Sequence, residues 1–488
     1  MNYVKSKMVP VHIAYGGLAL FISLLNNVFL LFYVTTFLTV FEIDSTSFYI
    51  GETIFLVWNS INDPLFGWLS DHNVLENKSD ASKDVTTTTV LKRINILSKV
   101  GPIYSACFLL FWFRFLPVWI QFSVALCLYD SFLTLVDLHH QALLADLAIE
   151  AKDRVKLNSY CSMFSAIGSV SVFLSFSLWR KDNLFPFQLF CVALALVVAV
   201  GFHVCCKSMK QYYLTTSIKK RDDAQPVSKQ YKTSFTAMKK YTCQLYRHHN
   251  FLVFSVMNFL QVFHCHFNSN FFPLFIQNLL GHKISQEGGA ALLGLSFLVP
   301  HINNLYFLQL CKRYGVYFII KVLFMVKVSL ALCMWHLGVS HWYLLCLFIM
   351  SNRIFTEGTC KLLNLVISDL VDEDYVKFKR SSPVSALVFG TAAFLSKPGQ
   401  TLAPVLGSYL LYAQTGKSLF LKQSEPDAVY EESSDFSNGC FFVMVMVSII
   451  CGLLQLLVWK FFSLKEKYLQ QVKNDRYYME KGYHSNVI

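Results

Sequence analysis

The fold class is decided by residues 58–71, which read WNSINDPLFGWLSD. This stretch belongs to an apolar run, yet it carries Asn59, Asn62 and Asp63 and ends at Asp71. A charge at the centre of a bilayer costs about 2.5–3.5 kcal/mol on insertion scales, so such residues usually line a cavity. The stretch therefore predicts a membrane-spanning helix that has one polar face.

The composition of the whole chain points the same way. Of its 488 residues, 55% are hydrophobic, 16% are aromatic and 15% are charged, whereas soluble globular chains carry about 25% charged residues. This balance argues against a water-soluble enzyme, a disordered chain and a nucleic-acid-binding module. Most of the 14 cysteines lie in apolar runs, where Cys behaves as a small hydrophobic residue. We therefore expect no disulfide framework, metal site or redox site.

Twelve segments are apolar over the roughly 20 residues that a transmembrane helix needs. Six lie near residues 11–38, 47–69, 97–113, 116–145, 158–179 and 186–206, and six near 250–276, 289–311, 316–336, 341–368, 383–412 and 439–463. The sequence thus predicts an all-α membrane protein with twelve transmembrane helices in two six-helix halves. The predicted parts are an N-terminal half (1–206), a basic cytoplasmic linker (207–249), a C-terminal half (250–463) and a cytoplasmic tail (464–488).

The orientation follows from the Lys and Arg residues of alternate loops, because basic residues tend to stay cytoplasmic. With the N-terminus inside, the inner segments hold 29 basic residues and the outer loops hold 6. We therefore expect both termini in the cytoplasm. The expected location is the plasma membrane, with an internal membrane as the alternative. The glycosylation sequon at Asn77 then falls in an inner loop and should be silent.

Two of the predicted helices carry several polar side chains on one face, at steps of three, four or seven residues. These are Glu52, Asn59 and Asp63 in one helix and Asp130, Thr134 and Asp137 in the other. Their carboxylates leave excess negative charge in the membrane, which a bound cation or proton would relieve. Asp130 is predicted to line the substrate cavity, with a role in helix packing as the alternative.

Two further segments place charges in apolar surroundings. Arg353, Glu357 and Lys361 follow one another at four-residue steps. They either neutralise one another along one helix or line a substrate cavity. Lys397 stands beside a Pro-Gly pair, where a helix can break and free its backbone carbonyl groups.

Histidine and asparagine residues add polar positions to the helices. The pairs His139-His140 and His264-His266 are either metal ligands or ordinary buried histidines, and adjacent or alternate positions on a helix point in different directions. We favour the second interpretation. The C-terminal half of a central cavity is predicted to be lined by His264, Asn268, Asn270, His301, Asn303 and Asn304, together with Arg353 and Glu357.

The stretch at residues 58–71 resembles helix 2 of the glycoside–pentoside–hexuronide:cation symporters, a branch of the major facilitator superfamily that includes melibiose permease. Gly67-x-Leu69-x-Asp71 also resembles a loop motif of the superfamily, with its basic end, Lys92-Arg93, displaced by an insert. Further matches are DLVD at 369–372 and KPGQ at 397–400. The resemblance implies the major facilitator superfamily fold.

Three ungapped phrases narrow the resemblance to one animal branch of that family. They are TLVDLHHQALLAD at 134–146, FHCHFNSNFFP at 263–273 and FTEGTCK at 355–361.

The same resemblance implies roles for particular residues. The residues that match cation-site positions of the symporters are Asn62, Asp63, Thr134 and Asp137, with Lys397 next to that site and Asn59 where the bacterial symporters have a further carboxylate. The sugar-binding acid and arginine of the family align near Ser23 and Cys161. The cation site is thus partly retained, whereas the known sugar clamp is absent.

The coupling ion, H⁺ or Na⁺, follows from a charge count. In the relatives, three carboxylates and one lysine sum to a formal −2, whereas Asp63, Asp137 and Lys397 here sum to −1. A carboxylate in an apolar setting binds a proton more readily than one in water, so we expect a proton. Asp130 would restore the missing charge if it pointed at the same cavity.

The resulting hypothesis is a secondary active transporter that symports a cation or proton with a small polar solute, carbohydrate-like by family resemblance. It is not expected to be an enzyme or to need a cofactor. The expected partners are the solute, the coupling ion and the lipid bilayer, and no nucleic acid. The alternative is a transporter-shaped receptor or scaffold without a transport cycle.

Overall fold

The computed structural model describes residues 9–76, 85–148, 150–180, 183–218, 235–281, 283–380, 382–415 and 434–480. These residues are mainly helical and contain no strand. The long helices of the first half are α1 (Val11–Thr35), α2 (Ser45–Glu76), α3 (Val85–Phe108), α4 (Val118–Leu147), α5 (Ala151–Leu178) and α6 (Phe185–Ile218). Those of the second half are α8 (His249–Phe275), α9 (Gln286–Tyr314), α10 (Val316–Leu337), α11 (Trp342–Lys377), α12 (Ser385–Thr415) and α13 (Ser434–Lys460).

Shorter elements complete the chain. Helix α7 (Phe235–Tyr246) precedes α8, and α14 (Glu466–Glu480) follows α13. Short turns extend three long helices: the π-helical turns η2 (Thr36–Val40) and η4 (Ile276–Leu280), and the 3₁₀ turn η3 (Leu109–Phe111).

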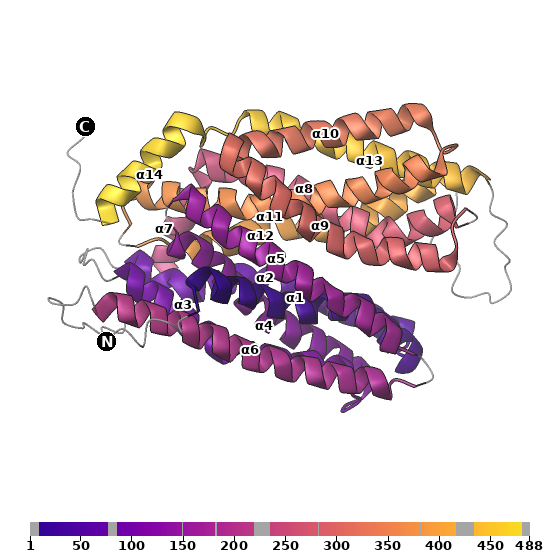
Figure 1. Cartoon of the computed structure of the whole chain (residues 1–488), viewed down its shortest axis with the longest axis horizontal. Helices are drawn as coiled ribbons and strands as arrows, with labels where there is room; N and C mark the ends of the chain where they lie inside the picture. Colours follow the sequence, from indigo (N-terminus) through magenta and orange to yellow (C-terminus); the bar gives the residue numbers. More distant parts are fainter. Residues whose placement is uncertain are drawn as a thin grey trace. The chain divides into compact units, whose positions relative to one another are not determined.

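The chain forms two compact units that do not simply follow its order. The first unit contains Met1–His248, Ile367–Phe394 and Leu464–Ile488, and the second contains His249–Val366 and Leu395–Ser463. In the first unit, α1 packs mainly against α5 and α6, α3 against α4 and α6, and α2 against α4. Figure 1 shows α1 to α6, coloured indigo to magenta, running alongside one another. In the second unit, α13 packs against both α8 and α10.

The exposed side chains of α2 are those expected of a helix that faces lipid. Val57, Ile61 and Leu69 recur at multiples of four residues and are 50–57% exposed, whereas Asn62 and Asp63 on another face are at most 6% exposed. An apolar exterior and a polar interior are the reverse of a water-soluble helix. The structure therefore supports the prediction of a membrane-spanning helix with one inward polar face.

Hydropathy alone identifies half of the long helices as membrane spans. Among the described residues, α1, α3, α4, α6, α10 and α13 are long and apolar enough to cross a membrane. The other six long helices contain 27–36 residues. Several of these carry the polar residues predicted for the site, which lowers their mean hydropathy.

Two local features differ from the sequence-based expectation. The third span was predicted at residues 97–113, but α3 already begins at Val85, and Arg93 lies buried inside it. Hydropathy places a charged residue in a loop, whereas ion pairs keep Arg93 within the helix bundle of the first unit. Helix α12 is continuous through Pro398 and Gly399, so the helix break considered there does not occur.

Two glycines let α2 approach the first turns of α12 closely within the first unit. A Cβ atom on Gly67 would lie 2.9 Å from the carbonyl oxygen of Ala386, and one on Gly390 would lie 2.6 Å from that of Asp63. Only glycine allows backbones to come this near. The contact places the polar face of α2 beside the start of α12.

Candidate functional site

A polar cluster joins α2 and α4 within the first unit. The Nδ2 group of Asn62 donates hydrogen bonds to Oδ2 of Asp130 and, over 3.2 Å, to Oγ1 of Thr134. Beside them, Nε1 of Trp58 donates to Oγ of Ser131 over 2.8 Å. Asp130 and Thr134 were predicted on one face of a helix, and the structure turns that face toward Asn62.

The remaining predicted acids of the first unit lie on the same two helices. Asp63 is 6% exposed and follows Asn62 directly in α2. Asp137 in α4 is partly buried and interacts electrostatically with Tyr104 and Tyr129. The hydroxyl groups of these two tyrosines are 3.0 Å apart. Membrane-facing helices thus present several oxygen ligands and carboxylates to their interior.

One member of the predicted set takes part in another contact of the first unit. Glu52 accepts a hydrogen bond of 3.4 Å from the hydroxyl group of Tyr33, so it belongs to the α1–α2 contact. Lys397 is partly buried and belongs to the second unit, whereas Asp63 and Asp137 belong to the first. The grouping of Lys397 with these acids stays a prediction, as does the cation-site role of Asn59, which is partly buried in α2.

In the second unit, Arg353 of α11 lies closer to neutral hydrogen-bond acceptors than to the carboxylate of Glu357. Its NH1 group donates to Oγ of Ser269 over 2.7 Å and its Nε to the carbonyl of Ser296 over 3.2 Å. Its guanidinium carbon lies 4.8 Å from the ring centre of Phe297. The nearest approach to Glu357 is 4.0 Å, so the two residues form only a loose pair along the helix.

Other predicted cavity residues of the second unit join a buried network. Asn352 donates to Oδ1 of Asn268 over 3.1 Å, and Asn268 donates to Oγ1 of Thr356 over 3.4 Å. His264 and Asn304 are fully buried.

A separate pocket of about 360 Å³ lies between α9 and α11 and is lined by Val299, Ile302, Asn303, Tyr306, Ser351, Ile354 and Phe355. This lining is mostly apolar and includes Asn303 from the predicted cavity set.

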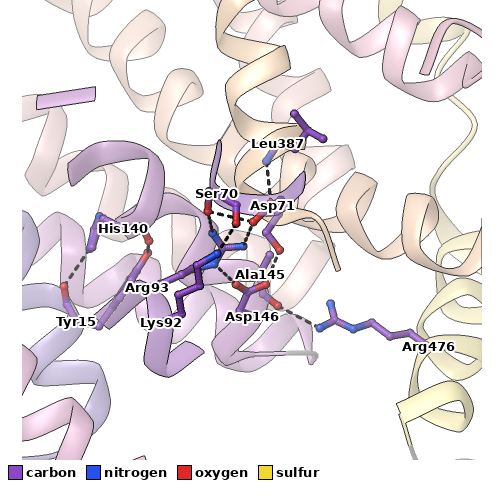
Figure 2. Close-up of polar contacts among 11 residues, drawn as sticks. Tyr15, Ser70, Asp71, Lys92, Arg93, His140, Ala145, Asp146, Leu387 and Arg476 are labelled. Carbon is purple, nitrogen blue, oxygen red and sulfur yellow. Dashed lines mark hydrogen bonds and ion pairs between the residues drawn. The ribbon is translucent and has the colours of Figure 1, made fainter. Parts of the chain in front are cut away.

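The histidine pair of α4 has a structural role at one of its two positions. Nε2 of His140 lies 3.1 Å from the carbonyl oxygen of Tyr15, and the two rings stack with centres 4.3 Å apart (Figure 2). Within the described ranges, no three or more His, Cys, Asp or Glu residues converge as a metal site would require.

A buried ion-pair cluster lies around Arg93, and sequence analysis did not predict it (Figure 2). Arg93 is 1% exposed, with Nε 2.5 Å from Oδ2 of Asp146 and NH2 3.1 Å from Oδ1 of Asp71. The second oxygen of Asp71 accepts the backbone N–H of Leu387 over 2.9 Å, and Asp146 also accepts a hydrogen bond from Ser385. Arg93, in the displaced basic end of the loop motif, thus forms an ion pair with Asp71, the aspartate of the same motif.

A second cluster of charges lies in the same unit, near the end of α11. Arg154 donates to Asp369 over 2.9 Å and to Asp372 over 2.8 Å. Arg476 of α14 also pairs with Asp372. Burial by itself would raise the pKa of Asp372, but the guanidinium groups of Arg154 and Arg476 outweigh it and lower that pKa below its usual value. The carboxylate is therefore held in its charged form.

Comparison with known proteins identifies the family. A family model described as MFS/sugar transport protein matches residues 12–466. The chain belongs to this family. It is 50% identical over 492 residues to transmembrane protein 180 of Gallus gallus. The aligned residues cover 97% of this chain and 96% of that relative. It is 47% identical over 497 residues to transmembrane protein 180 of Mus musculus, covering 96% and 95%. These relatives confirm the resemblance to one animal branch.

Solved structures show the fold of this MFS family member. A bacterial homologue of the iron transporter ferroportin, in an outward-facing state, matches with a TM-score of 0.64 at 12% identity, over 94% of this chain and all of that one. The fucose:proton symporter of E. coli matches with a TM-score of 0.56 at 12% identity, over 93% and 98%. The chain is thus an integral, multi-pass membrane protein with the major facilitator superfamily fold, as predicted.

Sequence reasoning missed several residues of this MFS protein that the structure buries. Arg154 and Arg476 look like ordinary loop or tail residues in the sequence, because their acidic partners are far away along the chain. Lys327 could have been found, since it is a charge near the middle of the apolar run 316–336. The criterion that singled out Asp63 applies to it equally.

Proposed function

We propose that this chain is a secondary transporter that couples sodium to the movement of a small polar solute by alternating access in the plasma membrane. Membership of the MFS/sugar transport protein family supports transport. The observation that carries the coupling proposal is the contact of Asn62 with Asp130 and Thr134. This contact brings a carboxylate and a hydroxyl oxygen close together, and hard cations prefer oxygen ligands.

The position of Asp130 favours sodium over a proton. Without Asp130, the predicted site of Asp63, Asp137 and Lys397 carries a formal charge of −1. We propose that Asp130, which accepts a hydrogen bond from Asn62, belongs to this site and supplies the charge that is missing at Asn59. The sum becomes −2, and the additional attraction offsets more of the cost of dehydrating a sodium ion.

We propose that the solute is carbohydrate-like but is not held by the acid–arginine clamp of the bacterial symporters. The family description includes sugar transport, and one of the structural neighbours carries fucose with a proton. The clamp positions hold Ser23 and Cys161, and Sγ of Cys161 lies 3.9 Å from Nε2 of His140. The polar residues of the second unit around Arg353 and Asn268 are the proposed alternative lining.

Sodium binding can be tested by thermal unfolding of the purified protein in sodium chloride and in choline chloride of equal concentration. The Tm of the native protein should rise saturably with sodium, and Asp63→Asn and Asp130→Asn should each abolish this rise. Asp153→Asn, an exposed position on α5, is the matched control and should keep it. If the native Tm responded to pH but not to sodium, the coupling ion would be a proton and not sodium.

Transport itself requires a separate measurement. The purified protein in liposomes should accumulate at least one compound from a panel of labelled monosaccharides, glycosides and uronic acids when a sodium gradient is imposed. Asp130→Asn should remove the dependence on the gradient. Sodium-specific stabilisation without gradient-driven uptake of any compound in the panel would favour the receptor or scaffold function.

A further inference from the structure

Lys327 lies near the middle of α10, a membrane span of 22 residues, and is 3% exposed. Its Nζ lies 3.1 Å from Nδ1 of His264 and 2.5 Å from Oε1 of Gln455. The ring centre of Phe324 is 5.3 Å from the same nitrogen. None of the partners that the structure gives to Lys327 is a carboxylate. A charged lysine at this depth is costly, so its presence calls for a function.

A series of hydrogen bonds begins at Lys327, and in each of them the residue nearer to Lys327 is the donor. Gln455 accepts from Lys327 and donates through Nε2 to Oε1 of Gln261 over 2.6 Å, and Gln261 donates to the carbonyl oxygen of Thr356 over 2.7 Å. These directions leave an acceptor facing residue 327. The network therefore requires an N–H donor at this position, and an apolar side chain would leave buried acceptors unpaired.

The other side of the network fixes the tautomer of His264. When Nδ1 accepts from Lys327, the ring proton lies on Nε2, which is 3.4 Å from Oγ of Ser448. Ser448 in turn donates to the carbonyl oxygen of Met444 over 2.9 Å and accepts from Asn352 over 2.8 Å. The imidazole is thus a neutral acceptor toward the lysine.

We propose that Lys327 and His264 form a proton-binding site within the second unit, separate from the acidic cluster of α2 and α4. The two nitrogen bases hold one proton as the lysine ammonium. A second proton would place two positive charges 3.1 Å apart in an apolar interior, which is prohibitively costly.

Release of the proton leaves the hydrogen bonds in place. The ammonium has three N–H groups and uses two of them, toward His264 and Gln455. After the third proton leaves, the neutral amine still has two N–H groups for the same acceptors, and the net charge of the site changes from +1 to 0. Lysine can take this role because it releases a proton readily when it is buried, whereas arginine does not.

The surroundings fit a proton better than a solute or an anion. The side chain of Lys327 is almost completely covered, and a proton requires no cavity. The other titratable groups that face the ammonium are the thiols of Cys265 in α8, Cys360 in α11 and Cys451 in α13. Because Asn352 and Thr356 belong to α11, a change in charge at Lys327 acts on the helix that carries Arg353 and Glu357.

The test compares Lys327→Arg, which keeps the positive charge but holds its proton, with Lys321→Arg, an exposed position on the same helix. The Tm of each purified protein is measured between about pH 6 and about pH 10, the range that covers histidine and lysine titration, in sodium-free buffer. The native protein and Lys321→Arg should share one pH-dependent step in Tm that Lys327→Arg has lost. An unchanged step in Lys327→Arg would overturn the proposal.

A second variant covers the case in which arginine does not fit. His264→Gln keeps the lysine and an acceptor, and it should displace the midpoint of the pH-dependent step, whereas His336→Gln, at an exposed position on α10, should not. A midpoint unaffected by His264→Gln would contradict the pairing. These measurements contain no sodium, and the variants leave the polar cluster of α2 and α4 intact. The result for Lys327 and His264 is therefore independent of the sodium test.

Discussion

Arg93 shows how a single side chain can neutralise two buried acids. It lies between Asp71 and Asp146, and all three are at most 7% exposed. The pair of carboxylates without the guanidinium would be two uncompensated charges in an apolar interior. The backbone N–H of Leu387 and the hydroxyl of Ser385 complete the shell around the acids.

We expect Arg93→Met to destabilise the protein by about 3–5 kcal/mol, because removal of one partner leaves buried charges unpaired. Lys99→Met, an exposed position on the same helix, is the control and should change stability little. Thermal unfolding of the purified variants measures both. Equal Tm values for the two variants would mean that the acids find another partner.

From the burial of His248 we predict that the protein loses stability in mild acid. Burial lowers the pKa of this imidazole below its usual value of 6.5, and Glu373 and Asp374 raise it only in part. The unfolded state therefore binds the proton more readily, so the contribution of His248 to stability is complete above about pH 6.5 and declines as the pH falls below that value.

His248→Gln should accordingly lose less Tm than the native protein between about pH 7.5 and about pH 5, where histidine titrates. His249→Gln, at the exposed neighbouring position, should follow the native profile. If both variants follow it equally, protonation of His248 is not coupled to unfolding.

At the scale of elements, helix α14 (Glu466–Glu480) is attached to the first unit by side chains along its length. Tyr468 donates to Oε1 of Glu373 over 2.9 Å, and Lys473 lies 3.0 Å from Asp369. Burial and, to a smaller extent, the charge of Glu373 raise the pKa of Tyr468 to about 12. Arg476 is fully buried against Asp372 and the carbonyl oxygen of Ala145.

Arg476→Met should therefore destabilise the protein by about 1–3 kcal/mol, the penalty for leaving a buried polar group unsatisfied. The loss is smaller than at Arg93 because Arg154 still pairs with Asp372. Lys467→Met is the exposed control on α14. Limited proteolysis should also cut α14 faster in Arg476→Met, and unchanged cutting would show that the other contacts suffice.

At the scale of the whole molecule, the distribution of basic residues predicts which ends of the helices face the cytoplasm. The ratio of 29 to 6 predicts that both termini lie there. A glycosylation acceptor inserted between residues 413 and 437 should therefore be modified in cells, and a glycosidase-sensitive mass shift would reveal it. Modification of the native sequon at Asn77 would instead show the opposite orientation. Asn77 lies outside the described residues, as does most of the loop that receives the insertion.

The sequence by itself determined the helices and much of their polar pattern. A helix that faces lipid must be apolar over about 20 residues, which is a local property, so the order of twelve long helices was predicted correctly. Helical spacing likewise placed Asp130 and Thr134 on one face of α4. Local hydropathy failed at the start of α3, because Arg93 is kept inside by partners that a sequence window does not contain.

Only the tertiary structure decided which side chains meet. Asn62 reaches Asp130 across 68 positions and Lys327 reaches His264 across 63 positions. Asp372 lies 218 positions from Arg154. Such contacts depend on how helices pack and rotate against one another, and no periodicity within a single helix contains that information. The sequence therefore identified the acidic and polar residues on one face of α2 and of α4, whereas the partner that each of them contacts is a property of the folded chain.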